Sequence, residues 1–252
     1  MGFIPQAIVY ISPNIIDDLI NLSQNSAVLE DLSNAIALLL SGDEALWQIV
    51  RLSLWVSGLA VFLSGLAGVP IGAWLGLRDF RGREWLTAFI YTGMGFPPVV
   101  VGLVVFLLLS RQGPLGTLGW LFTPTAMVTA QIILALPLII GVTMTAVRDV
   151  SPELRQQMRA LGATDRQVLF TTLREARNGV IVGLVAGFGA AISEVGAVML
   201  VGANIRGKTQ VLTTAIVEET RKGEFSLALA LGIVLLSLAF LVNLATVFMS
   251  RE

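Results

Sequence analysis

The sequence contains no cysteine and no histidine in its 252 residues. Without cysteine there is no disulfide bond, thiolate ligand or thiol nucleophile, and without histidine there is no imidazole metal ligand or proton relay. Charged residues are also scarce, at 13% of the chain, and the formal net charge of -1 does not favour nucleic acid as a partner. We therefore expect no catalytic residue, no metal site and no cofactor in this chain.

Hydrophobic residues, in contrast, make up 55% of the sequence and give it a mean hydropathy of +0.83. Values this high are rare in a soluble domain and indicate a protein that crosses a membrane several times. Five weakly charged stretches are long enough to cross about 30 Å of hydrocarbon, so we predict an all-α membrane protein with about five transmembrane helices. The predicted spans are residues 53–77, 86–109, 122–147, 180–201 and 227–249. Prolines near the middle of the second and third spans should bend them, namely Pro97, Pro98 and Pro137.

The first 46 residues are predicted to lie outside the transmembrane domain. They lack the basic start of a secretory signal peptide, and Asp17 and Asp18 come too early for an uninterrupted apolar core. Within residues 27–46, acidic residues break the apolar run, which favours a helix that lies at the membrane interface. We therefore divide the chain into an N-terminal tail with an interfacial helix, residues 1–46, and a transmembrane domain, residues 47–252.

The longest polar interruption between the spans is residues 148–178. Pro152 suits the first position of a helix, where its missing N–H costs nothing, and Gly162 supplies a C-terminal stop. Thr164 and Gln167 have the spacing of a capping box, which predicts the start of a second helix. The segment should therefore form two short helices that meet at a glycine hinge. The apolar stripe of the first helix consists of Leu154, Met158 and Leu161.

The distribution of basic residues predicts the orientation, because loops rich in lysine and arginine stay on the cytoplasmic side. Segment 148–178 should therefore be cytoplasmic. With five spans, this places the N-terminus outside and the C-terminus inside the cell, and it makes residues 202–226 an external loop. The arginines on which the prediction depends are Arg148, Arg155, Arg159, Arg166, Arg174 and Arg177.

Residues 202–209, GANIRGKT, match the phosphate-loop pattern GxxxxGK[ST] letter for letter. A phosphate loop needs a preceding strand in a parallel sheet, a following helix and an acidic residue elsewhere to hold magnesium. Here the preceding residues belong to an apolar run long enough to cross a bilayer, and strands do not alternate with helices. We interpret the match as a loop between spans rather than as the site of a nucleotide-binding enzyme.

Four residues are candidates for a transport pathway: Glu194, Arg206, Lys208 and Thr209. Glu194 is the one carboxylate deep within a predicted span, and the cost of an ionisable group there predicts that it faces the helix bundle and has a donor partner. It would either line the pathway or make a structural hydrogen bond. Arg206 and Lys208 could attract an anion, and Thr209 could donate its hydroxyl, although a solvated loop also accounts for all three.

The pattern P-x-L-x4-R-x-L-G-A at residues 152–163 resembles the cytoplasmic coupling loop, or EAA loop, of ABC importer permeases. The sequence departs from that loop at the triplet Gln156, Gln157 and Met158, where the family has Glu-Ala-Ala. Three further segments resemble the tungstate and molybdate branch of the family. The chain is thus similar to the permease subunit of a type I ABC importer. The three segments are residues 95–116, 123–137 and 193–216.

The resemblance implies a homodimer that forms one transport path in the cytoplasmic (inner) membrane of a prokaryote, surrounded by lipid. It also implies ABC ATPase subunits, which would hold ATP and Mg²⁺, and an extracytoplasmic oxyanion-binding protein. The substrate would be tungstate or molybdate. The alternatives are another oxyanion, such as sulfate, and a membrane scaffold that transports nothing. The residues expected to couple the permease to the ATPase are Glu153, Arg155, Gln156, Arg159, Gly162 and Ala163.

Overall fold

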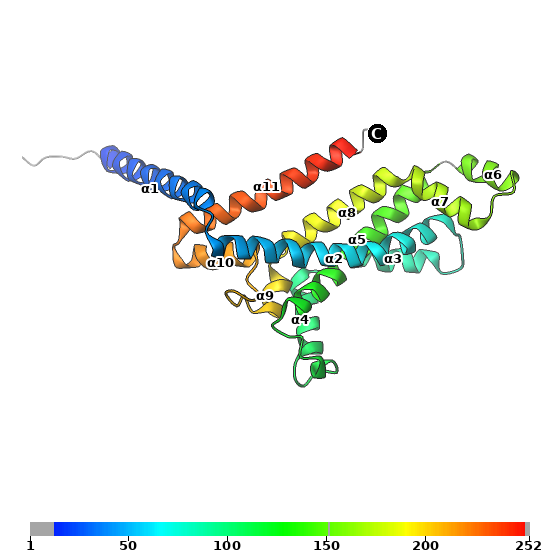
Figure 1. Ribbon diagram of the computed structural model, residues 1–252, viewed down its shortest axis with the longest axis horizontal. Coiled ribbons are helices and arrows are strands. Elements are labelled where there is room, and N and C mark those ends of the chain that lie inside the picture. Colours follow the sequence, from blue (N-terminus) through cyan, green and yellow to red (C-terminus); the bar gives the residue numbers. More distant parts are fainter. Residues whose placement is uncertain (1–12, 151, 250–252) are drawn as a thin grey trace, which may run out of the picture.

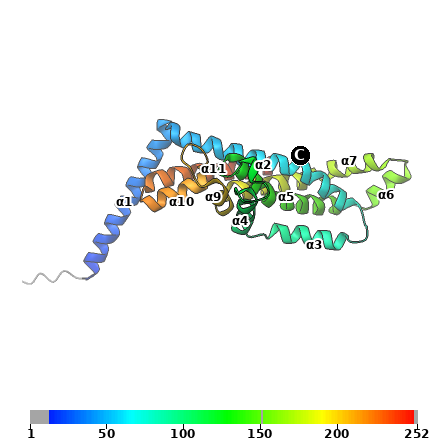
Figure 2. The same cartoon turned by 90° about the horizontal axis from the view of Figure 1, so that it is seen from below.

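The computed structural model describes residues 13–150 and 152–249, and within them it contains helices and no strands. The predicted all-α fold class is therefore confirmed. The molecule is elongated, and helix α2 runs along much of its length (Figures 1 and 2). In chain order the elements are α1 (Pro13–Ser41), α2 (Glu44–Leu77), α3 (Arg83–Met94), α4 (Pro98–Leu109), the 3₁₀ helix η1 (Gly116–Leu118), α5 (Pro124–Asp149), α6 (Pro152–Ala160), α7 (Asp165–Glu175), α8 (Arg177–Ile192), α9 (Gly196–Gly202), α10 (Leu212–Lys222) and α11 (Phe225–Met249).

Among the described residues, three helices are each long and apolar enough to cross a membrane: α2, α5 and α11. They confirm the predicted spans 53–77, 122–147 and 227–249 as continuous helices, although α2 already begins at Glu44. Helix α5 continues through Pro137. The number of candidate spans becomes five if the bent pairs α3–α4 and α7–α8 each count as one.

The predicted span 86–109 is bent at its prolines, as expected, but the bend is a complete break, and the predicted span 180–201 is wrong as a continuous helix. The first is divided into α3 and α4, which are bent by 97° relative to each other. Pro98 explains this break, because proline disfavours a helical conformation in the residue before it but is well suited to start a helix. The second stops at Ile192 and resumes at Gly196. Hydropathy reveals neither break, since the residues on both sides remain largely apolar.

Helices α2 and α5 form the central pair of the fold, and α8 packs on α5 beside them. Glycines on α2 allow the two backbones to approach closely. A Cβ atom at Gly72 would lie 2.6 Å from the carbonyl oxygen of Ile140, and one at Gly76 would be similarly crowded by α5. A Cβ atom at Gly183 of α8 would lie 3.2 Å from the Cβ of Val142 of α5, a looser but still tight contact. The small residues therefore set the spacing of the bundle.

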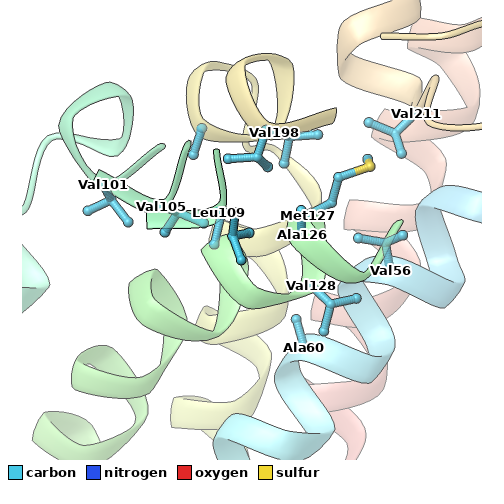
Figure 3. Close-up of a cluster of buried hydrophobic side chains, with 13 residues drawn as sticks. Val56, Ala60, Val101, Val105, Leu109, Ala126, Met127, Val128, Val198 and Val211 are labelled. Carbon is cyan, nitrogen blue, oxygen red and sulfur yellow. The ribbon is translucent and has the colours of Figure 1, made fainter. Parts of the chain in front are cut away.

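A hydrophobic cluster joins α2, α4, α5 and α9 (Figure 3). Helix α4 projects to one side of the central pair and packs on the short helix α9 (Figure 1). This packing is close at Gly102, where a Cβ atom would lie 2.5 Å from the Cα of Ala197. The cluster therefore holds the segments after both breaks against the central pair. Its labelled side chains are Val56, Ala60, Val101, Val105, Leu109, Ala126, Met127, Val128, Val198 and Val211.

Helices α6 and α7 lie at one end of α2, and α10 lies near the other end (Figure 1). The hydroxyl of Ser53 ties α2 to α10 by accepting a hydrogen bond from the backbone N–H of Leu212 at 2.8 Å. The polar segment 148–178 and the loop 202–226 are therefore far apart. A topology that puts these two segments on opposite sides of the membrane requires this separation. Which end faces the cytoplasm stays a prediction.

The helix predicted in residues 27–46 exists as the second part of α1 but ends at Ser41. Gly42, with a φ of +70°, then leads the chain into α2. Helix α1 packs on α11, where the hydroxyl of Ser226 donates a hydrogen bond to a carboxylate oxygen of Asp31 at 2.6 Å. The domain division after residue 46 and the location of this helix at a membrane interface stay predictions.

Candidate coupling loop and transport site

The first helix of the polar segment, α6, ends at a glycine, as predicted. The backbone N–H of Gly162 donates to the carbonyl of Arg159, and that of Ala163 donates to the carbonyl of Met158, each at 3.0 Å. Gly162 has a φ of +84°, in the left-handed region. This pair of bonds is a Schellman motif, which favours glycine because a Cβ atom is strained in that conformation. The predicted stop at Gly162, where the two short helices meet, is therefore confirmed, and its action as a hinge stays a prediction.

The second helix, α7, begins with the predicted capping box. The side chain of Thr164 accepts a hydrogen bond from the N–H of Gln167 at 3.4 Å, and the side chain of Gln167 accepts one from the N–H of Thr164 at 2.8 Å. Helix α7 is anchored, because Val168 is buried and the helix contacts α2, α5 and α8. Helix α6 has no buried residue and packs mainly on α7. The segment therefore presents an exposed helix on a fixed base.

The predicted coupling residues lie on α6 and on its hinge. The guanidinium of Arg155 donates to the carbonyl of Val150 at 3.2 Å, which ties α6 to the end of α5. Arg159 lies 3.8 Å from Asp165 in an exposed ion pair, and such pairs contribute only about 0–1 kcal/mol. Gln156 is exposed. These side chains are accessible to a second protein, and their contact with an ATPase stays a prediction.

Glu194 lies in the break between α8 and α9 rather than within a continuous span. Its side chain is buried, and Oε1 accepts a hydrogen bond from the backbone N–H of Ala197 at 2.8 Å. The expected hydrogen-bond donor therefore exists, but it is the backbone amide of Ala197 rather than a side chain. This amide lies in the first turn of α9, where backbone N–H groups have no acceptor within the helix. The hydroxyl of Thr213 donates to the carbonyl of Glu194 at 2.8 Å. The break is thereby joined to α10.

Gln131 of α5 supports the same break, although it is not among the residues predicted above. Its amide group is buried and donates to the carbonyl of Ala191 at 2.8 Å. Its own carbonyl oxygen has no hydrogen-bond partner among the described residues. A signal for Gln131 was present in the sequence, since it is the one amide and there is no charged residue in the predicted span 122–147. The break is thus a polar site inside the hydrophobic bundle.

Arg206, Lys208 and Thr209 lie together in the loop between α9 and α10. Thr209 is fully buried, and its hydroxyl donates to the carbonyl of Gly202 at 2.6 Å and accepts from the N–H of Ile205 at 2.9 Å. In this conformation the hydroxyl is occupied within the loop and is not available to an anion. Arg206 and Lys208 are exposed, in agreement with a role at the surface.

The segment that matches the phosphate-loop pattern, residues 202–209, follows helix α9 rather than a strand. In a phosphate loop the backbone amides point at the ligand. Here the amides of Lys208 and Thr209 donate to the carbonyl of Ile205 at 3.0 and 2.9 Å. The amides are therefore already used, which favours the interpretation of this match as a structural loop.

A polar network fixes the loop to α10. One carboxylate oxygen of Glu218 accepts hydrogen bonds from the side-chain amides of Asn204 and Gln210 at 2.6 and 2.7 Å. Lys222 pairs with Glu218 and, at 3.1 Å, with the buried carboxylate of Glu219. Hydrogen bonding from Lys222 lowers the pKa of Glu218, and hydrogen bonding to Glu218 and Glu219 raises the pKa of Lys222. The full network consists of Asn204, Arg206, Gln210, Glu218, Glu219 and Lys222.

This network should hold the loop over a wide pH window and weaken outside it. The stabilisation from Glu218 is present above its ordinary pKa of 4.5 and is lost as the pH falls through its lower folded value. The stabilisation from Lys222 is present below its ordinary pKa of 10.5 and is lost as the pH rises through the higher pKa of Lys222 in the folded protein. Hydrogen exchange of the loop amides, corrected for intrinsic rates, should therefore stay constant between these limits and accelerate beyond them. Exchange that is slowest in acid would contradict this prediction, and Glu218→Gln should remove the acid-side change.

Residues 68–252 match the sequence family described as binding-protein-dependent transport system inner membrane component. The chain belongs to this family. It is 49% identical over 201 residues to the probable anion ABC transporter permease protein of Haloferax volcanii, and this alignment covers 78% of this chain and 87% of that protein. It is 39% identical over 225 residues to the tungstate uptake system permease protein TupB of Peptoclostridium acidaminophilum, and this alignment covers 89% of this chain and 98% of that protein.

A solved structure of a bacterial ABC transporter involved in the import of the acidic polysaccharide alginate has the same fold. The superposition has a TM-score of 0.72 at 21% sequence identity and covers 95% of this chain and 92% of that chain. At this identity the likeness establishes the fold alone. Together with the family match, it identifies the chain as a type I ABC importer permease subunit, as the resemblance of the coupling loop and of segments 95–116, 123–137 and 193–216 had predicted.

Proposed function

We propose that this permease subunit moves tungstate or molybdate across the cytoplasmic membrane of a prokaryote. The observation that carries the proposal is the 39% identity to a tungstate permease over 98% of that protein's length. Tungstate and molybdate have the same charge and shape, so one path can carry both. The choice between them would then be made by an extracytoplasmic binding protein that delivers the anion.

In this proposal ATP and Mg²⁺ are held by separate ATPase subunits that contact α6. The helix is exposed but joined at both ends to anchored elements, through Arg155 to the end of α5 and through the Gly162 hinge to α7. A rigid-body motion of the ATPase would therefore pass into the bundle without any catalytic group in this chain. The proposed coupling residues remain Glu153, Arg155, Gln156, Arg159, Gly162 and Ala163.

We place the transport pathway beside the break between α8 and α9. Because a carboxylate repels an oxyanion, we assign Glu194 to holding the start of α9 rather than to binding the substrate. Arg206 and Lys208 are exposed cations in the loop that leads into α10, the helix at the opposite end of α2 from α6, where they would raise the local concentration of an anion. Thr209 would maintain the shape of their loop.

The proposed topology has α6 and α7 in the cytoplasm, the N-terminus outside and the C-terminus inside, as the arginine distribution predicts. Two copies would form the path as a homodimer within the lipid. Exposed apolar side chains support a partner copy or lipid on the outer faces of α4 and α11. Those on α4 include Val99, Val100, Leu103, Val104 and Leu107, and those on α11 include Leu236, Phe240 and Leu241.

Uptake by vesicles that contain the permease, its ATPase and its binding protein would test this function. With ATP inside the vesicles, tungstate or molybdate should accumulate, as measured by mass spectrometry of the metal, and removal of the binding protein should stop accumulation. Calorimetry of the binding protein with tungstate, molybdate and sulfate identifies the preferred anion independently.

Two outcomes would contradict the proposal. Accumulation of sulfate in preference to the other two anions would favour the alternative of a sulfate permease. ATP hydrolysis by the intact complex without accumulation of any of the three anions would favour the alternative of a membrane scaffold that transports nothing.

A further inference from the structure

A small cavity with basic walls lies where the end of α2 meets the start of α7. Its volume is about 160 Å³. Three arginines surround it, contributed by the end of α2, by α6 and by α7, and the floor between them is mainly apolar. The cavity is lined by Trp74, Leu77, Arg78, Arg159, Asp165, Arg166, Val168 and Leu169.

The position of this cavity along α2 places it at a membrane surface. Residues 52–77 contain no charged side chain, and Arg78 is the first charge after them. Trp74 is 45% exposed and lies against Phe80, with ring centroids 5.0 Å apart. Exposed tryptophans are typical of the level at which lipid headgroups begin. The cavity therefore opens near the headgroups of the leaflet on the α6–α7 side.

The cavity also has an excess of positive charge. Asp165 is its only carboxylate, and it is shared by Arg78 at 3.5 Å and Arg159 at 3.8 Å. Arg166 has no ion-pair partner within residues 13–150 and 152–249. The nearby Asp79 is already paired with Arg83. Three guanidinium groups therefore face one carboxylate, which leaves a net charge of +2 for a ligand to neutralise.

We propose that this cavity binds the phosphate group of an anionic phospholipid. A phosphate oxyanion matches the fork of hydrogen-bond donors that each guanidinium presents, and basic pockets at this level of a bilayer bind acidic headgroups. Inorganic phosphate shares this chemistry. A lipid is favoured because Trp74 and Leu77 continue the apolar surface of α2 to the edge of the cavity, where acyl chains would lie. The bound lipid would link Arg78 on α2 to Arg166 on α7, next to the coupling hinge.

Native mass spectrometry of the purified permease, alone and in complex with its ATPase, titrated with phosphatidylglycerol against a phosphatidylcholine background, would test the proposal. Loss of both Arg78 and Arg166, as Arg78→Gln with Arg166→Gln, should weaken retention of phosphatidylglycerol about 25-fold, from about fivefold for each arginine near a membrane surface. Arg174→Gln removes the same charge from α7 outside the cavity and should leave retention at that site unchanged. The elution volume and melting temperature of each variant verify that it is folded.

Four results would overturn the proposal. In the first, the double variant retains phosphatidylglycerol as well as the unaltered chain does. In the second, Arg174→Gln weakens retention equally, which would mean that only surface charge matters. In the third, millimolar inorganic phosphate displaces the lipid, which would assign the cavity to a free anion. In the fourth, the double variant loses its ATPase while retaining lipid, which would assign the surface to that protein. None of these results depends on which anion the permease transports.

Discussion

Replacing Gly72 with leucine is expected to prevent the permease from accumulating as a folded protein. The Cβ atom alone would lie 2.6 Å from the carbonyl oxygen of Ile140 and 2.9 Å from the Cβ of Thr143, both on α5. A change of rotamer cannot relieve this overlap, because the Cβ position is fixed by the backbone. Overpacking of this kind costs about 1–3 kcal/mol, and separating the central helix pair costs more. Yield and melting temperature in detergent, followed by size-exclusion chromatography, measure the effect.

Alanine at two positions of the same helix provides a matched control. A Cβ atom at Gly58 would meet no atom within 4 Å, so Gly58→Ala should stabilise α2 by about 0.5–1 kcal/mol through its higher helix propensity. Gly72→Ala should instead destabilise the protein by about 1–3 kcal/mol. The two substitutions should therefore shift the melting temperature in opposite directions. Equal melting temperatures would show that α2 and α5 are not held together at Gly72.

Gly162→Leu is expected to separate ATP hydrolysis from uptake while the protein remains folded. The site has open space around it, so the leucine side chain meets no obstacle, but a φ of +84° costs a residue with a Cβ atom about 1–2 kcal/mol. A strained hinge would favour other directions of α6, and motion of an ATPase would then no longer reach the bundle. The number of anions transported per ATP should fall about 5- to 30-fold. Vesicles that contain all components measure both quantities.

Gly162→Asn distinguishes the backbone conformation from the side chain. Asparagine tolerates the left-handed region better than other residues with a Cβ atom, so most of the coupling should remain. Equal loss in both variants would show that any side chain at this position interferes with the partner. Wild-type coupling in Gly162→Leu would mean that the hinge is not needed.

The coupling loop was predictable because its structure is specified locally. Pro152, Gly162 and the pair Thr164 and Gln167 each act within one helical turn, through a fixed φ or a single side chain that bonds to the nearby backbone. Such signals survive in any tertiary context that leaves the segment exposed. The start of α6, its end and the start of α7 therefore all agree with the sequence.

The break between α8 and α9 was not predictable from hydropathy, because it depends on contacts between distant parts of the chain. Gln131 lies 60 residues before the carbonyl of Ala191 that it holds. The hydroxyl of Thr213 reaches back 19 residues to Glu194. Neither contact leaves a periodic signal, and the surrounding residues are as apolar as those of a continuous span. Glu194 was therefore found as a residue but placed in the wrong kind of element.

Thr209 illustrates a different limit. Its hydroxyl lies next to Lys208 in the loop between α9 and α10, and this pair of residue types is typical of an anion site. Composition alone does not say whether that hydroxyl is free. The answer depends on the backbone, because Ala203 and Asn204 have φ of +58° and +48° and the Thr209 hydroxyl bonds to Gly202 and Ile205 on either side of them. A left-handed alanine has no sequence signature, whereas the glycines with positive φ at the helix ends do.

Helix α5 connects the polar break between α8 and α9 to the coupling segment. Gln131, which bonds to the break, lies near the start of α5, and α6 follows directly after its end. The distance along the helix from Gln131 to Asp149 is about 27 Å at 1.5 Å per residue. A tilt of α5 by about 5° relative to α8 would displace the amide of Gln131 from the carbonyl of Ala191 by roughly 2 Å, and a hydrogen bond of 2.8 Å does not survive such a displacement. A small rotation at the α6 end of α5 would therefore release the buried carbonyl of Ala191, more than about 20 Å away along the helix, if the bend at Pro137 does not absorb it. The hydrogen bond between Gln131 and Ala191 would thus break once the tilt of α5 exceeds a threshold, rather than lengthen gradually.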